Sequence, residues 1–205
     1  MPLGRGFKAE AERIIEDIRD DLGVAADQQI DPLRLAEHLG IEVRRADELV
    51  DVRALRELES LHPGAFSACT FKPKPGRTVI VYNSLSSIAR RNSDLSHELA
   101  HIILRHELSR LERLGELSYF VCDASQEEEA AWLSGCLLLP RKLLLADLRR
   151  GLTASDIARR RHVSESMVTY RINVTGATRQ VGSFTRRLAK TRAARDTRRK
   201  LQASG

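Results

Sequence analysis

The feature that most constrains this chain is the run of residues 94–104, which contains His97, Glu98 and His101 in the pattern H-E-x-x-H. Apolar residues recur through it at helical spacing, which predicts a helix capped by Ser93 or Asp94. On a helix the two histidines lie one turn apart on one face, so both imidazoles can bind one metal ion. Glu98 is rotated by about 100° from His97. Its carboxylate is therefore expected to lie off the metal, as a general base.

A third metal ligand is expected from a second helix, residues 126–139, which begins with Glu127, Glu128 and Glu129. Acidic residues at this end of a helix also complement its dipole without binding anything. Their side chains leave the helix about 100° apart, so at most one can point squarely at the ion. Glu127 shares a face with the small residues Ala131 and Ser134, which suit close helix packing. We therefore favour Glu127, with Glu128 and Glu129 as alternatives.

The rest of the first 140 residues reads as helices around a few strands. Helices are predicted over 8–22, 32–39, 47–60 and 84–92, and a short strand over 41–43. Two further strands, 65–71 and 78–83, are predicted to form a hairpin with a loose, proline-containing loop. If the strand 78–83 is an exposed sheet edge, a substrate backbone can pair with it, and Val79 and Val81 are then substrate-binding residues.

The last third of the chain differs in charge from the rest. Residues 141–205 carry 17 Lys and Arg against 4 Asp and Glu, a net charge of +13, whereas the whole chain carries +6. Residues 153–172 read as helix, turn and helix, with His162 in the turn. This indicates either a nucleic-acid-binding element or a helical pair packed on the domain before it. We expect three parts: a domain over 1–150, the pair over 151–181, and a loosely ordered basic tail over 182–205.

The chain resembles the ImmA/IrrE family of bacterial metallopeptidases. The resemblance spans roughly residues 10–176 and rests on several segments in the same order: Ala65–Thr70, Val79–Asn83, Arg90–Leu104, the acidic helix Glu127–Pro140, and Val163-Ser164 with Arg171. Where the family often carries Asn or Asp that can brace the metal site, this chain has Ala131.

The resemblance implies an α+β, zincin-like fold, in which helices pack on a small, partly antiparallel sheet. It implies a bound Zn²⁺ held by His97, His101 and Glu127, the acidic position found by counting back from Pro140. It also implies cleavage of a helix-turn-helix transcriptional repressor, which switches on the genes under that repressor. We assign no residue as the oxyanion donor. If the helix that contains His101 continues to His106, the two side chains lie about 140° apart around its axis, so His106 is poorly placed to be a metal ligand.

The sequence also indicates a cellular compartment, and it leaves two other functions open. Three cysteines without a disulfide-like spacing, and no apolar run at the start of the chain, favour the cytosol. One alternative function is a DNA-binding regulator with a structural or inactive zinc site. The other is a toxin-type or regulatory partner that binds a helix-turn-helix protein without cutting it.

Overall fold

The computed structural model describes residues 3–182, apart from 75, 107–109, 115–116 and 122. Its helices and strands follow in this order: α1 Phe7–Leu22, α2 Pro32–His38, β1 Glu42–Arg45, the 3₁₀ turn Ala46–Glu48, α3 Val52–Leu61, β2 Ala68–Lys74, β3 Arg77–Tyr82, α4 Ile88–Ile103, β4 Arg110–Leu114, β5 Leu117–Val121, α5 Ala124–Leu138, α6 Arg141–Arg149, α7 Ala154–Arg161 and α8 Glu165–Thr175. The predicted α+β class is confirmed.

The main sheet has three strands in the order β1-β3-β2. β3 pairs in parallel with β1 and antiparallel with β2, so β3 is the central strand. Val79 and Val81 are buried, and they pack with Ala46 and Leu55. The prediction that Val79 and Val81 bind a substrate strand is therefore wrong, because both sides of β3 are already hydrogen-bonded. The outer strand that lies near α4, the helix that carries His97 and His101, is β2.

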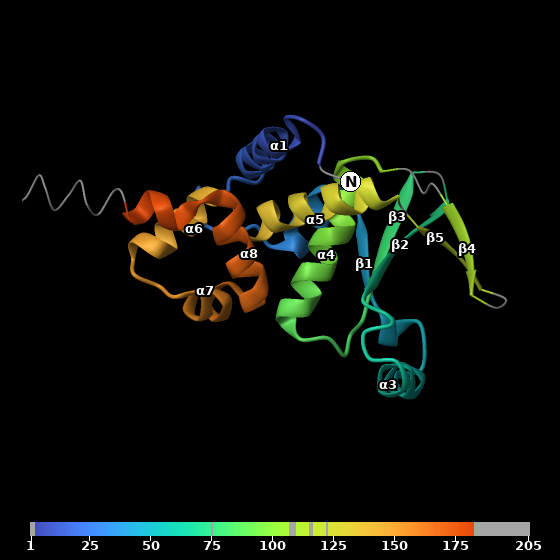
Figure 1. The fold of residues 1–205 in the computed structure, drawn as a ribbon. Coiled ribbons are helices and arrows are strands. Elements are labelled where there is room, and N and C mark those ends of the chain that lie inside the picture. The colour runs from blue at the N-terminus through green and yellow to red at the C-terminus, as the bar shows by residue number, and fades with distance from the viewer. Residues whose placement is uncertain (1–2, 75, 107–109, 115–116, 122, 183–205) are drawn as a thin grey trace, which may run out of the picture.

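The histidines lie on α4, which is longer than the sequence indicated. It begins after Ser87, whose hydroxyl accepts a hydrogen bond from the Arg90 amide, so the segment 84–92 does not form a separate helix. α4 packs against α5 in the centre of the molecule, between the sheet and the C-terminal helices (Figure 1). Apolar residues of these helices are buried together with part of α1: Leu95, Leu99, Ala100, Ala130, Leu133 and Leu137 with Ala11 and Ile15.

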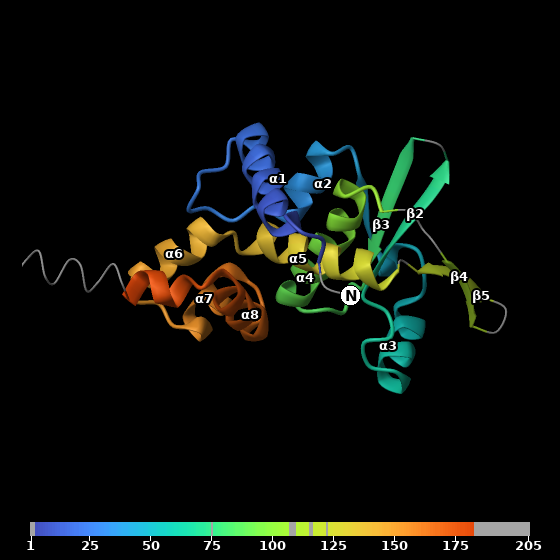
Figure 2. The same ribbon diagram turned by 45° about the horizontal axis from the view of Figure 1, so that its top comes forward.

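The helix-turn-helix pattern forms as predicted, from α7 and α8. His162 ends α7 in the left-handed conformation, with φ 49° and ψ 50°, where a glycine is commonly found. Figure 2 shows the pair beside α6, beyond the end of α5. A second apolar cluster unites these elements, and it contains Leu138, Leu139, Leu143, Leu144, Ile157, Val163 and Val168. The core of the C-terminal part therefore begins inside the end of α5.

Arg171 fixes α8 to the rest of the molecule. Its side chain is fully buried and forms an ion pair of 3.1 Å with Glu12 on α1. Its Nε donates a hydrogen bond of 3.1 Å to the carbonyl oxygen of Leu139, and it lies against Gly135. Removal of Glu12 would leave the buried Arg171 charge without this partner, which is costly, so the contact ties α8 to α1 and α5.

Two other expectations concern the ends of the chain and the membrane. Residues 183–205, nearly the whole of the predicted basic tail, lie outside the described residues. Among the helices that the structure describes, none combines the length and apolar character needed to cross a bilayer.

Candidate metal centre

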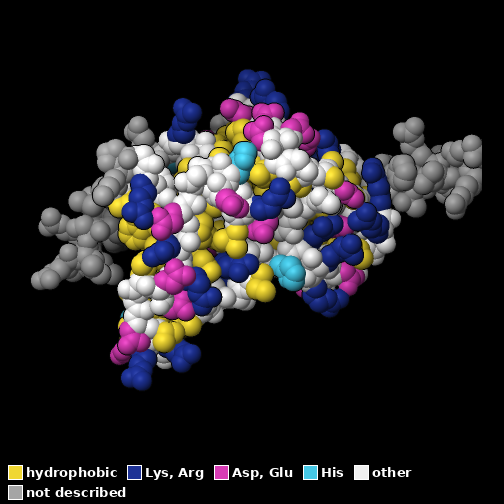
Figure 3. Space-filling model, turned by 180° about the vertical axis from the view of Figure 1, so that it is seen from behind, with side chains coloured by type: hydrophobic (Ala, Val, Ile, Leu, Met, Phe, Trp, Pro, Cys, Tyr) yellow, Lys and Arg dark blue, Asp and Glu magenta, His cyan; other side chains and the backbone are white. Residues whose placement is uncertain are grey.

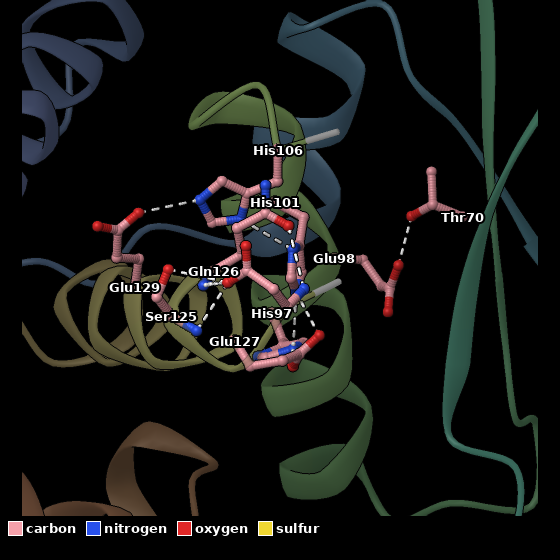
Figure 4. A network of polar contacts seen from close by, with 10 residues as sticks. Thr70, His97, Glu98, His101, His106, Ser125, Gln126, Glu127 and Glu129 are labelled. Carbon is pink, nitrogen blue, oxygen red and sulfur yellow. Dashed lines mark hydrogen bonds and ion pairs between the residues drawn. The ribbon is translucent and has the colours of Figure 1, made fainter. Parts of the chain in front are cut away.

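Three side chains from two helices converge at the crossing of α4 and α5 (Figure 4). The Nε2 atoms of His97 and His101 lie 3.0 Å apart. The carboxylate of Glu127 lies 3.1 Å from Nε2 of His97 and 3.5 Å from Nε2 of His101. The structure therefore brings together the three residues that the sequence analysis selected as metal ligands.

These distances are within about 0.3 Å of those around a tetrahedral zinc ion, with two of the three slightly shorter. Nitrogen and oxygen ligands bound at 2.0–2.2 Å to a tetrahedral ion lie roughly 3.3–3.6 Å from one another. Burial, helped by the neighbouring His97, lowers the pKa of His101 to about 4. His101 is therefore neutral near pH 7, as a ligand must be. Two imidazoles and one carboxylate form a donor set typical of catalytic zinc sites.

The start of α5 determines which glutamate faces the histidines. Asp123 accepts hydrogen bonds from the Ser125 and Gln126 amides, and the Asp123 amide donates a hydrogen bond to the side-chain oxygen of Gln126. This capping box fixes the first turn. Glu127 then points to His97 and His101, and Glu129 points to His106 (Figure 4). The neighbouring Ala131 lies at the rim of the cleft described below and offers no polar atom to the site.

Glu98 occupies the other side of the histidine pair. Its carboxylate accepts a hydrogen bond from the hydroxyl of Thr70 on the edge strand β2 (Figure 4). Burial raises the pKa of Glu98, and the Thr70 bond opposes that shift. Glu98 is thus a partly buried carboxylate that is hydrogen-bonded to Thr70 and lies outside the group formed by His97, His101 and Glu127. Thr70 was missed in the sequence analysis, because its contact joins residues 28 positions apart in the chain.

A cleft of about 710 Å³ opens beside His97 and Glu98. Its walls are the first half of α4, the small residues Ala131 and Ser134 of α5, and the start of α8. Met167 and Tyr170 of α8 line it, and the rest of its lining is rich in serine: Ser67, Ser87, Ser93, Ser134, Ser164 and Ser166. The helix-turn-helix pair therefore forms one wall of the cleft at the candidate metal centre.

Comparisons with known proteins point to one family. The family model described as the IrrE N-terminal-like domain, Peptidase_M78, matches residues 36–173. No curated protein sequence matches the chain. A solved structure, a transcriptional regulator of Mycobacterium tuberculosis, is similar over 83% of this chain, with 14% identity and a TM-score of 0.45. The chain spans only 47% of the length of that protein.

Proposed function

The chain belongs to the IrrE N-terminal-like domain family of peptidases, and on that premise we propose that it is a cytosolic zinc endopeptidase of the H-E-x-x-H type that cleaves a helix-turn-helix repressor. The observation that carries the proposal is the convergence of His97, His101 and Glu127 beside a separate carboxylate, Glu98, at the edge of a cleft. Free thiols at Cys69 and Cys136 suit the reducing cytosol.

In this proposal three residues of the chain bind the ion and a fourth transfers the proton. His97, His101 and Glu127 would hold the ion. A bound zinc ion supplies Lewis-acid chemistry, lowering the pKa of water toward neutrality and polarising a peptide carbonyl. Glu98 takes a proton from the attacking water and then delivers it to the leaving amine. Thr70 keeps the Glu98 carboxylate in place beside the histidines.

The surroundings of the centre suit an extended peptide substrate. β2 is an outer strand of the sheet and carries Thr70, which contacts Glu98, so a peptide backbone paired with the outer edge of β2 would lie near Glu98. The hydroxyl-rich cleft continues from there towards α8, where Met167 and Tyr170 offer apolar contacts. A flexible segment of a repressor fits these surfaces better than a rigid domain does, because backbone pairing needs an extended chain.

The test is incubation of the zinc-loaded protein with the helix-turn-helix protein encoded beside it, followed by mass analysis of fragments. We expect discrete fragments from the wild-type protein and none from the Glu98→Gln variant, because an amide cannot accept the proton of the attacking water. The variant keeps all three ligands, so its zinc content, measured by atomic absorption, should equal that of the wild type. Full cleavage by Glu98→Gln would reject the mechanism.

The two alternative functions give different results in that experiment. A partner that stays intact in the presence of the zinc-loaded protein would favour the toxin-type or regulatory role. Binding of nucleic acid by the basic C-terminal third also stays a prediction. Figure 3 shows Lys and Arg side chains gathered over the C-terminal helices. Met167 and Tyr170 of α8 face the cleft. Several cations of the C-terminal helices are paired with carboxylates, and one of them, Arg171, is buried: Lys142, Arg150, Arg159, Arg161 and Arg171.

A further inference from the structure

His106 lies in the turn directly after α4, the helix that carries His97 and His101. Arg105 has a left-handed backbone conformation, with φ 55°. The amide of His106 donates to the carbonyl of His101, and the amide of Arg105 donates to that of Ile102. This hydrogen-bond pattern is a Schellman motif, which ends the helix and turns the chain back over its last turn. The turn brings His106 against His101, whereas on a continued helix it would point elsewhere.

The side chain of His106 joins His101 to a carboxylate. Its Nδ1 lies 3.0 Å from Nδ1 of His101, and its Nε2 lies 3.3 Å from a carboxylate oxygen of Glu129 (Figure 4). Only 6% of the His106 side chain is exposed. The chain Glu129–His106–His101 therefore runs from α5, through a shielded ring, to the side of His101 that faces away from Glu127.

The directions of these hydrogen bonds agree with one arrangement of protons. If His101 binds a metal through Nε2, its Nδ1 carries the proton and donates to Nδ1 of His106. Nδ1 of His106 is then an acceptor, so its proton lies on Nε2 and is donated to Glu129. Each imidazole carries one proton, and each donor has an acceptor. A hydrogen bond of this kind fixes the orientation of a ligand histidine and increases its basicity.

We infer that His106 and Glu129 are positioning residues, which hold His101 with Nε2 free for the metal. This role supplies for His101 the polar support that Ala131 cannot provide from α5. The inference rests on the metal site of the proposed function, but it concerns binding of the ion alone. A protein that binds zinc and cuts nothing therefore still tests it.

The experiment measures the zinc affinity of the full chain by competition with a chromophoric chelator. His106→Leu fills a similar volume but accepts no hydrogen bond, so we expect its affinity to fall by about 10- to 100-fold. His106→Asn places an oxygen near the Nδ1 position and should recover most of that loss. Glu129→Gln keeps an acceptor but loses the charge, so we expect a smaller, severalfold decrease.

Two controls separate positioning from stability and from general loss of charge. Glu128→Gln, one position away on α5, and His38→Asn, on the exposed face of α2, should bind zinc as the wild type does. Thermal unfolding of each zinc-free variant reports any loss of fold. If His106→Leu lacks a stable fold, nitrogen NMR of the zinc-loaded wild type decides instead: the inference requires protons on Nδ1 of His101 and Nε2 of His106.

The possible failures are distinct. Unchanged zinc affinity in a folded His106→Leu variant overturns the inference and leaves the proposed function standing. A proton on Nδ1 of His106 in the zinc-loaded protein also overturns the inference and leaves the proposed function standing. A wild-type protein that binds no zinc overturns the proposed function, and this inference with it.

Discussion

Three consecutive glutamates at the start of α5 have three different surroundings. Glu127 faces His97 and His101, Glu128 is exposed, and Glu129 faces His106. We expect Glu127→Ala to lower zinc affinity by orders of magnitude, because it removes a proposed ligand, and Glu128→Ala to change it little. Glu129→Ala should fall between the two, because it removes only the support of His106. The chelator competition described above measures all three variants. Loss of the metal in Glu128→Ala would contradict the orientation of α5.

Residues that share one helix were the easiest to predict. The spacing of His97, Glu98 and His101 fixes their relative directions once the helix is assumed, and small neighbours singled out Glu127 among the glutamates of α5. The contacts of Thr70 and His106 could not be found in this way. The first depends on how β2 crosses α4, and the second on the backbone conformation of Arg105. A short-range signal for His106 does exist, since it follows His101 by five residues, the separation that a Schellman turn brings together.

The left-handed conformation of Arg105, in the turn after α4, leads to a prediction about stability. A residue with a Cβ atom in the left-handed conformation is strained by about 1 kcal/mol relative to glycine. Arg105→Gly should therefore increase the free energy of unfolding by about that amount, measured by urea denaturation of the zinc-free protein. Arg105→Ala is the matched control, because it also removes the guanidinium but keeps the Cβ atom. An equal gain in both variants would show that the side chain, not the backbone, is the source.

Strand order and helix boundaries illustrate what a local pattern leaves open. The alternation of Val79 and Val81 predicts a strand correctly, but it says nothing about which strands lie on either side. The residues of β1 that pair with β3 come 37 positions earlier in the chain, and this pairing makes β3 the central strand. Likewise, Ser87, Ser93 and Asp94 are all good helix caps, and the structure shows that α4 begins after the first of them.

At the level of the whole molecule, the contact between Gly135 and Arg171 joins α5 to the helix-turn-helix pair. A Cβ atom on Gly135 would lie 2.9 Å from Cδ of Arg171. Arg171 cannot move easily, because its far end is held by Glu12 and Leu139. We expect the clash in Gly135→Ala to cost about 1–3 kcal/mol and the gain in helix propensity to be no more than about 1 kcal/mol, so the variant should be less stable than the wild type.

Urea denaturation of Gly135→Ala, with and without Arg171→Ala, separates the two contributions. Removing the arginine side chain also removes the clash, so in the Arg171→Ala background the added methyl group should cost much less or be favourable. A stabilising effect of Gly135→Ala in the wild-type background would mean that α8 yields readily, contrary to the packing described here.

The packing of α1 against α5 also has a consequence for folding while the chain is being synthesised. Ala11 and Ile15 are covered by residues of α5 such as Leu133, about 120 positions later. At the usual pace of synthesis, this apolar face stays uncovered for roughly 6–24 s. Glu127 leaves the ribosome with α5 as well. We therefore expect the N-terminal half of a nascent chain to depend on chaperones during that interval, and the candidate metal centre to form only when α5 has been synthesised.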